Sequence, residues 1–93
     1  MKVIYKYPLV PETCLPVGAE ILHIGLQGLK LCVWALADPE EKTFEKRIVL
    51  LATGQLVNDF ELTTYTHYQT FLLDAEQSYV IHVFTRASKT DIV

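Results

Sequence analysis

A histidine and a cysteine are placed in this sequence so that they could face each other across a β-hairpin. Residues 19–38 form two apolar runs separated by Gln27-Gly28, and glycine takes the positive φ that a tight turn needs. A turn there sets His23 opposite Cys32, the minimum pair for a thiol nucleophile or the start of a metal site. No Asp or Asn lies close in sequence to orient the imidazole. We therefore interpret both as packing residues and predict no catalytic residue.

Two further histidines, His67 and His82, lie on segments that we expect to form adjacent strands. Together with His23 they make three imidazoles, enough in principle for a zinc ion. They lack the short, paired spacing that zinc ligands usually show. We interpret them as scattered strand residues and predict neither a metal site nor a cofactor.

Aromatic side chains interleaved with threonine suggest recognition rather than catalysis. The segment 62–74 combines aromatic rings with short hydroxyls, a mixture suited to binding surfaces but also typical of an ordinary exposed strand. The preceding loop, 54–61, could present further contacts. The single tryptophan is either a core anchor or part of a subunit interface. The candidate binding residues are Trp34, Asn58, Asp59, Phe60, Tyr65, Tyr68 and Phe71.

The elements that must position these residues are β-strands. Strand patterns cover residues 2–9, the two arms of 19–38, and 43–52, 62–74 and 78–86, with turn signals about every ten residues. Residues 10–18 contain two prolines and a glycine and predict a connecting loop that crosses between sheets. We predict one all-β domain over residues 1–93, a small antiparallel β-sandwich or open barrel of about six strands with little or no helix. Residues 87–93 are expected to fray.

The pattern of the hairpin predicts which of its side chains face the core of the domain. A turn at Gln27-Gly28 pairs Leu26 with Leu29, Ile24 with Leu31 and Leu22 with Val33, which makes one face apolar almost throughout. The opposite face carries His23, Cys32 and Trp34 and is half polar. We expect the first face to line the sandwich and the second to be either part of a wide core or the seam of an oligomer.

Composition excludes several classes of function. The hydrophobic share is 51%, high for 93 residues, which predicts that part of the surface is covered by a second copy or another partner. The net charge is -3 and the pI about 5.5, so a nucleic-acid partner is not expected. The longest apolar stretches are too interrupted to span a membrane, and the N-terminus lacks a signal-peptide core. These features predict a cytoplasmic protein with reduced cysteines.

Five segments occur in a characteristic order along the chain: MKVIYKYPL, LPVGAEILHIGLQ, LCVWALADP, the step Thr53-Gly54 and the closing strand YVIHVF. Together they resemble a family of small proteins encoded by bacteriophages and prophages. The chain departs from the family pattern where a histidine would follow Thr-Gly, because Gln55 stands there. The resemblance implies a phage protein that acts in the bacterial host cytoplasm, and it brings no known activity.

These observations favour a non-enzymatic, phage-encoded interaction protein that self-associates and binds or blocks a host component, with an anti-defence role as one example. A first alternative is a module that binds or sequesters a small molecule of nucleotide type, in a pocket formed between two copies and lined by Trp34, tyrosines and Lys30 or Arg86. A second alternative is a virion or assembly accessory protein. An enzyme based on His23 and Cys32 ranks last.

Overall fold

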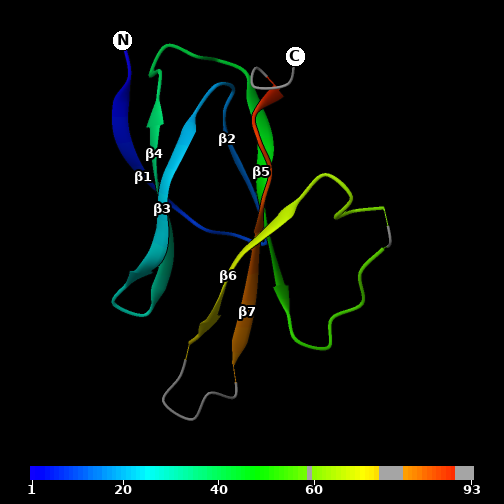
Figure 1. Cartoon of the computed structure of the whole chain (residues 1–93). Helices are drawn as coiled ribbons and strands as arrows, with labels where there is room; N and C mark the ends of the chain where they lie inside the picture. Colours follow the sequence, from blue (N-terminus) through cyan, green and yellow to red (C-terminus); the bar gives the residue numbers. More distant parts are fainter. Residues whose placement is uncertain (59, 74–78, 90–93) are drawn as a thin grey trace.

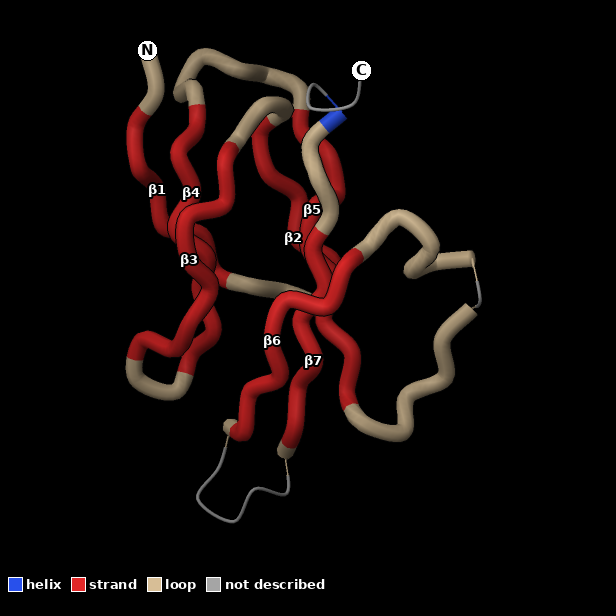
Figure 2. The backbone as a smooth tube through the Cα atoms, viewed as in Figure 1, coloured by secondary structure: helices blue, strands red, loops and turns tan. Residues whose placement is uncertain are grey.

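The computed structural model describes residues 1–58, 60–73 and 79–89, which form two antiparallel sheets packed face to face (Figures 1 and 2). The three-stranded sheet has the order β1-β4-β3, and the four-stranded sheet has the order β2-β5-β7-β6. The all-β prediction is confirmed, and the sheets do not close into a barrel. The strands are β1 (Val3–Pro8), β2 (Glu12–Pro16), β3 (Glu20–Gln27), β4 (Lys30–Ala37), β5 (Phe44–Ala52), β6 (Thr66–Leu72) and β7 (Val80–Thr85).

The strand β2 corrects the prediction of a loop over residues 10–18. Thr13 and Leu15 are buried and alternate with the exposed Glu12 and Cys14, as a half-buried strand requires, and the buried Pro16 ends the pattern. Pro11 precedes the strand and Pro16 is its last residue. Because β2 lies at the edge of the four-stranded sheet, a proline there removes no hydrogen bond from the middle of the ladder. The expected crossing between sheets falls instead in the short link between β1 and β2.

The core lies between the two sheets and draws on both. Val33, Ala35 and Ala37 of β4 are completely buried, and so are Ile48 of β5 and Val83 of β7. Small residues on β4 let the facing sheet approach, while larger aliphatic side chains fill the space on the other side. The core cluster is Leu15, Ala19, Ile24, Leu31, Val33, Ala35, Ala37, Ile48, Phe71, Ile81 and Val83.

The hairpin between β3 and β4 forms as expected, with its turn one residue later than predicted. Gly28 has a φ of 63° and begins the turn, and Gln27 pairs with Lys30. From His23 to Gln27 each partner therefore moves by two residues, so that Ile24 lies opposite Val33 rather than Leu31. Over this part of the hairpin a shift of two keeps each side chain on its predicted face, and Ile24, Leu31 and Val33 line the core as expected. Leu26 and Leu29, next to the turn, were expected on the core face but are 42% and 84% exposed.

A β-bulge in β3 overturns one predicted core position. The register shifts between Ile21 and His23, so Leu22 has no residue directly opposite it. Ile21 packs against the core and Ile24 is completely buried, whereas Leu22 is 46% exposed. The bulge lets both isoleucines face inward and turns the leucine out.

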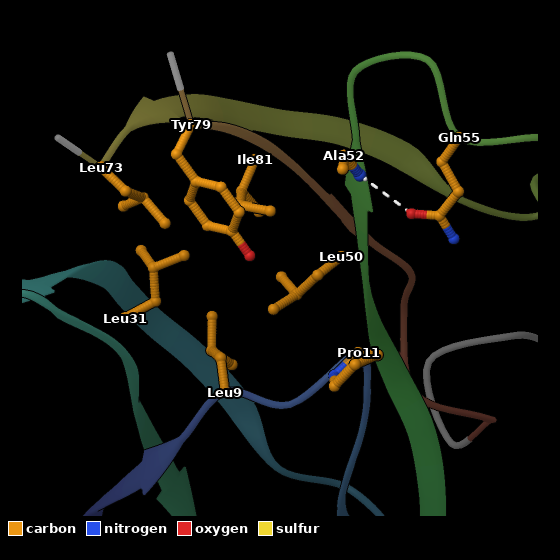
Figure 3. Close-up of a pocket in the computed structure, with 9 residues that line it drawn as sticks. All are labelled: Leu9, Pro11, Leu31, Leu50, Ala52, Gln55, Leu73, Tyr79 and Ile81. Carbon is orange, nitrogen blue, oxygen red and sulfur yellow. Dashed lines mark hydrogen bonds between the residues drawn. The ribbon is translucent and has the colours of Figure 1, made fainter. Parts of the chain in front are cut away.

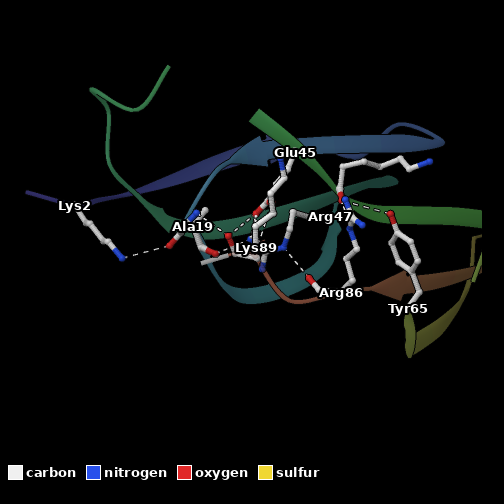
Figure 4. A network of polar contacts seen from close by, with 10 residues as sticks. Lys2, Ala19, Glu45, Arg47, Tyr65, Arg86 and Lys89 are labelled. Atoms are coloured by element: carbon white, nitrogen blue, oxygen red, sulfur yellow. Dashed lines mark hydrogen bonds and ion pairs between the residues drawn. The ribbon is translucent and has the colours of Figure 1, made fainter. Parts of the chain in front are cut away.

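A buried ion pair between Glu45 and Arg47 connects several segments at the end of the sandwich where β5 begins (Figure 4). The Arg47 Nη1 lies 3.8 Å from the Glu45 Oε1 and donates to the Ala19 carbonyl at 2.8 Å, while its Nε donates to the Arg86 carbonyl at 2.7 Å. Both side chains are almost completely buried. The pair therefore connects β5 to the turn before β3 and to the segment after β7.

Ser88 differs from the expectation of a frayed tail. Its hydroxyl donates to the Glu45 carboxylate and accepts from the Gly18 N–H at 2.8 Å. The Lys89 N–H also donates to Glu45, at 3.1 Å, and Ser88 is 1% exposed. A buried carboxylate must find donors, and Ser88 and the Lys89 N–H supply two of them. Residues 90–93 lie outside the described part of the chain.

The environment of Glu45 lowers its pKa. Burial acts to raise the pKa of this carboxyl, but hydrogen bonds from Ser88 and the Lys89 amide and the positive charges of Arg47 and Lys89 outweigh it. The net direction is below the ordinary value of 4.5. Glu45 is therefore ionised at neutral pH, as the ion pair with Arg47 requires.

Candidate functional site

An apolar pocket opens between the two sheets at the end of the sandwich opposite the Glu45–Arg47 pair (Figure 3). Its volume is about 390 Å³, within the range of small-molecule sites. Its walls come from both sheets and from three connecting segments. The lining residues are Leu9, Pro11, Leu31, Leu50, Ala52, Gln55, Leu73, Tyr79 and Ile81.

Two polar side chains stand among these aliphatic walls. The Gln55 Oε1 accepts a hydrogen bond from the Ala52 N–H at 3.0 Å, which holds the amide at the rim of the pocket. Tyr79 is 55% exposed, and its ring reaches from the start of β7 toward Leu50, with the hydroxyl directed into the pocket (Figure 3). The lining side chains are thus mostly aliphatic, and two hydrogen-bonding side chains stand among them.

The edge strand β1 presents apolar side chains on both of its faces. Val3 and Tyr5, on the face turned toward the four-stranded sheet, are 43% and 39% exposed, and Ile4 on the opposite face is 59% exposed. A shallow hollow of about 200 Å³ adjoins Tyr5, and its wall also includes Tyr7 and Phe44 together with the acidic residues Asp38 and Glu41. The two-sheet core is therefore left uncovered along this edge.

Tyr7 shows that the inner side of β1 is partly shielded from water. Burial, and to a lesser extent the neighbouring Tyr5, raises the pKa of the Tyr7 phenol above its ordinary value of 10.0. The two rings meet edge to face, with their centroids 6.2 Å apart. The Tyr7 phenol is therefore neutral at physiological pH, and the paired rings suit an apolar contact surface.

The predicted His23–Cys32 pair does not form. Because the turn is displaced, His23 pairs with Trp34, and Cys32 pairs with Gly25. The His23 ring lies 5.7 Å from the Trp34 ring and covers Gly25, where a Cβ atom would come within 2.6 Å of the imidazole Nε2. Trp34 lies on the outer face of the three-stranded sheet, half-buried, so it is not a core anchor.

His67 and His82 are neighbours, as the strand pattern predicted. Their ring centroids are 6.4 Å apart on the outer face of the four-stranded sheet. Thr70 links them: its hydroxyl lies 2.9 Å from the His67 Nε2 and 2.9 Å from the His82 Nδ1, while Thr53 lies 2.7 Å from the His82 Nε2. The threonines thus engage three of the four ring nitrogens in a row of polar contacts along this face.

Within residues 1–58, 60–73 and 79–89 there is no group of three or more His, Cys, Asp or Glu side chains that could hold a metal ion. His23 belongs to the other sheet, so the three imidazoles do not assemble. Both cysteines are free, with Cys14 exposed and Cys32 buried. The described elements also include no helix that is long and apolar enough to cross a membrane.

The aromatic group of the segment 62–74 is divided among three environments. Phe71 is 9% exposed and belongs to the core, so the expectation of a surface residue is wrong for it. Tyr65 donates to the Lys46 carbonyl at 3.4 Å and lies under the Arg86 guanidinium. Tyr68 stands at a bulge in β6, and its hydroxyl accepts from the Ile24 N–H at 3.2 Å, which joins the two sheets at one edge.

The loop between β5 and β6 exposes large apolar side chains, among them that of the candidate Phe60. Leu56 is 96% exposed and Phe60 is 82% exposed. The Asn58 side chain accepts from the Phe60 N–H at 3.0 Å, and its carbonyl accepts from the Glu61 N–H at 3.0 Å. Asn58 therefore shapes the turn that presents the phenyl ring, and Asp59 lies outside the described residues.

Sequence reasoning missed the pocket completely. None of the seven candidate binding residues lines it. Its leucines looked like ordinary core residues, and they come from segments far apart in the sequence. A signal was present at Leu9 and Pro11, because this apolar link between two strands has to pass from one sheet to the other.

A family comparison covers almost the whole chain. Residues 1–92 match the model of a family described as Domain of unknown function (DUF7352). Comparison with curated proteins and comparison with solved structures each found no match.

Proposed function

We propose that this chain, which belongs to the DUF7352 family, is a non-enzymatic binding protein that self-associates and binds or blocks a component of the bacterial host cytoplasm. A phage origin is part of the proposal and rests on the five ordered segments of the sequence. The observation that carries the proposal is the exposed apolar surface of β1, an edge strand with Val3, Ile4 and Tyr5 open to solvent.

A second copy of the chain fits this edge. An edge strand offers unpaired backbone groups, and pairing β1 with β1 of another copy would continue the ladder and cover the apolar side chains. Such a contact is symmetric and closes after two copies. Lys6 and Pro8, residue types that commonly limit pairing at sheet edges, restrict the contact to the first half of the strand.

Self-association predicts a mass of at least twice 10.6 kDa at tens of micromolar by light scattering. Ile4→Lys places a charge in the contact and is expected to give a monomer, because burying an unpaired charge is costly. Leu29→Lys is the matched control, since Leu29 is 84% exposed at the turn between β3 and β4 and should leave the mass unchanged. A wild-type mass of 10.6 kDa would refute self-association.

The host component is expected to bind the loop between β5 and β6. An exposed phenyl ring such as Phe60 gains most when it enters an apolar recess, so the partner we propose is a protein with such a recess. Immobilised wild-type protein should retain this partner from a host lysate, and Phe60→Ser should lose it while Leu29→Ser keeps it. Retention that is equal for all three proteins would contradict this assignment.

A further inference from the structure

We infer that the pocket between the sheets is a binding site for a small neutral molecule that has a predominantly apolar body and a hydrogen-bonding group. Val3, Ile4, Tyr5 and Phe60 do not line it, although Gln55 belongs to the same loop as Phe60. The pocket is formed by a single copy of the chain, because all nine lining residues belong to it. The inference therefore stands whether or not the protein self-associates.

The aliphatic walls of the pocket favour a ligand with an apolar body. Leu9 and Leu31 come from the side of the three-stranded sheet, and Leu50, Leu73 and Ile81 from the side of the four-stranded sheet (Figure 3). Aliphatic side chains from the two sheets would therefore contact a bound ligand on opposite sides. Moving an apolar surface out of water into this space contributes about 25 cal/mol for each Å² buried.

The charge of the lining determines the charge of the ligand. No lining residue is charged, so an ionised group would lose its hydration without meeting an opposite charge. This differs from the nucleotide-type ligand predicted from the sequence. Arg86 lies with Tyr65 and Lys46, and Lys30 stands in β4 outside the lining, so neither supplies a cation to the pocket.

The polar groups determine where the ligand's own polar group lies. The Tyr79 hydroxyl points into the pocket, and the Gln55 amide stands at one side of it beside Ala52, while the other lining side chains are aliphatic. A ligand with a hydroxyl, amide or carbonyl at one end would bury its apolar part and keep the polar end toward these two side chains. A molecule of the class of a medium-chain alcohol has this arrangement.

The first test is titration with the neutral fluorescent probe N-phenyl-1-naphthylamine. Wild type should give saturable fluorescence enhancement. Ala52→Phe fills the pocket and should weaken binding by roughly tenfold or more, corresponding to about 1.4 kcal/mol. Ala87→Phe makes the same change at an exposed position and should bind like wild type. Equal binding by Ala52→Phe, or no saturable signal from wild type, would overturn the inference.

The second test uses the wild-type protein alone, so it does not depend on how a variant folds. 1-Octanol should displace the probe, and octanoate at neutral pH should be roughly tenfold weaker or more, because the carboxylate would be desolvated without a counter-charge. Equal displacement by the two would refute a neutral site. The Ile4→Lys monomer should bind the probe like wild type, which separates this inference from the proposal of self-association.

Discussion

Replacing Arg47 with alanine is expected to lower the free energy of unfolding by about 3–5 kcal/mol, the cost of leaving a buried charge without its partner. The variant keeps Glu45, which is 5% exposed and would lose the guanidinium beside it. Two backbone carbonyls, of Ala19 and Arg86, would lose their donor as well. Small domains have a total stability of about 5–15 kcal/mol, so the loss is a large share of it.

Urea unfolding followed by circular dichroism measures this effect, and the neighbouring residue provides the control. Lys46 forms an exposed ion pair with Glu12 at 3.7 Å, and exposed pairs contribute about 0–1 kcal/mol. Lys46→Ala should therefore stay close to wild type. Equal losses for the two variants would show that the buried pair does not hold the end of the sandwich together.

The Glu45–Arg47 pair should also make the stability of the protein depend on pH in the acidic range. The pKa of Glu45 is lower in the folded protein than its ordinary value of 4.5, so the ionised carboxylate stabilises the fold fully above that pH. This contribution is lost as the pH falls below 4.5 and through the lower folded pKa. Wild type should have a higher free energy of unfolding than Glu45→Gln, and this difference should stay constant from neutral pH down to about 4.5. Below that pH the difference should disappear.

Replacing Leu15 with alanine is expected to cost about 2–5 kcal/mol, the usual range for removing a fully buried leucine side chain. Leu15 is completely buried in β2 and belongs to the core cluster. The prediction tests whether residues 12–16 are a strand of the sandwich or a loop on its surface. A loop residue would tolerate the change.

Leu29→Ala is the matched control for this prediction. Leu29 is 84% exposed at a turn, and surface substitutions of this kind usually change stability by about 0.5 kcal/mol or less. Urea unfolding of both variants gives the comparison. A Leu15→Ala variant as stable as Leu29→Ala would contradict the placement of β2.

Alternating apolar residues were sufficient to predict the all-β class, the β3–β4 hairpin and the contact between His67 and His82. Side-chain alternation reports which residues share a face, and it survived even the two-residue change of register in the hairpin. β2 was missed because prolines at both ends imitate a loop, although prolines are acceptable at the edge of a sheet.

The candidate site was less predictable because it depends on bulges and topology. A bulge turns Leu22 outward, and another lets Tyr68 reach Ile24 on the other sheet. Neither bulge has a glycine or proline to mark it. The pocket joins Leu9 with Leu73 and Ile81, and such distant partners become neighbours only when the order of the strands is known.

Amide hydrogen exchange along β1 tests the central claim most directly, because self-association at this edge should protect the backbone amides of residues 3–5 that do not already bond to β4. We expect exchange in wild type to slow as the protein concentration rises into the tens of micromolar, and Ile4→Lys to exchange rapidly throughout. Leu29→Lys should behave like wild type. Exchange in β1 that is fast and independent of concentration would contradict the claim that a second copy binds at this edge.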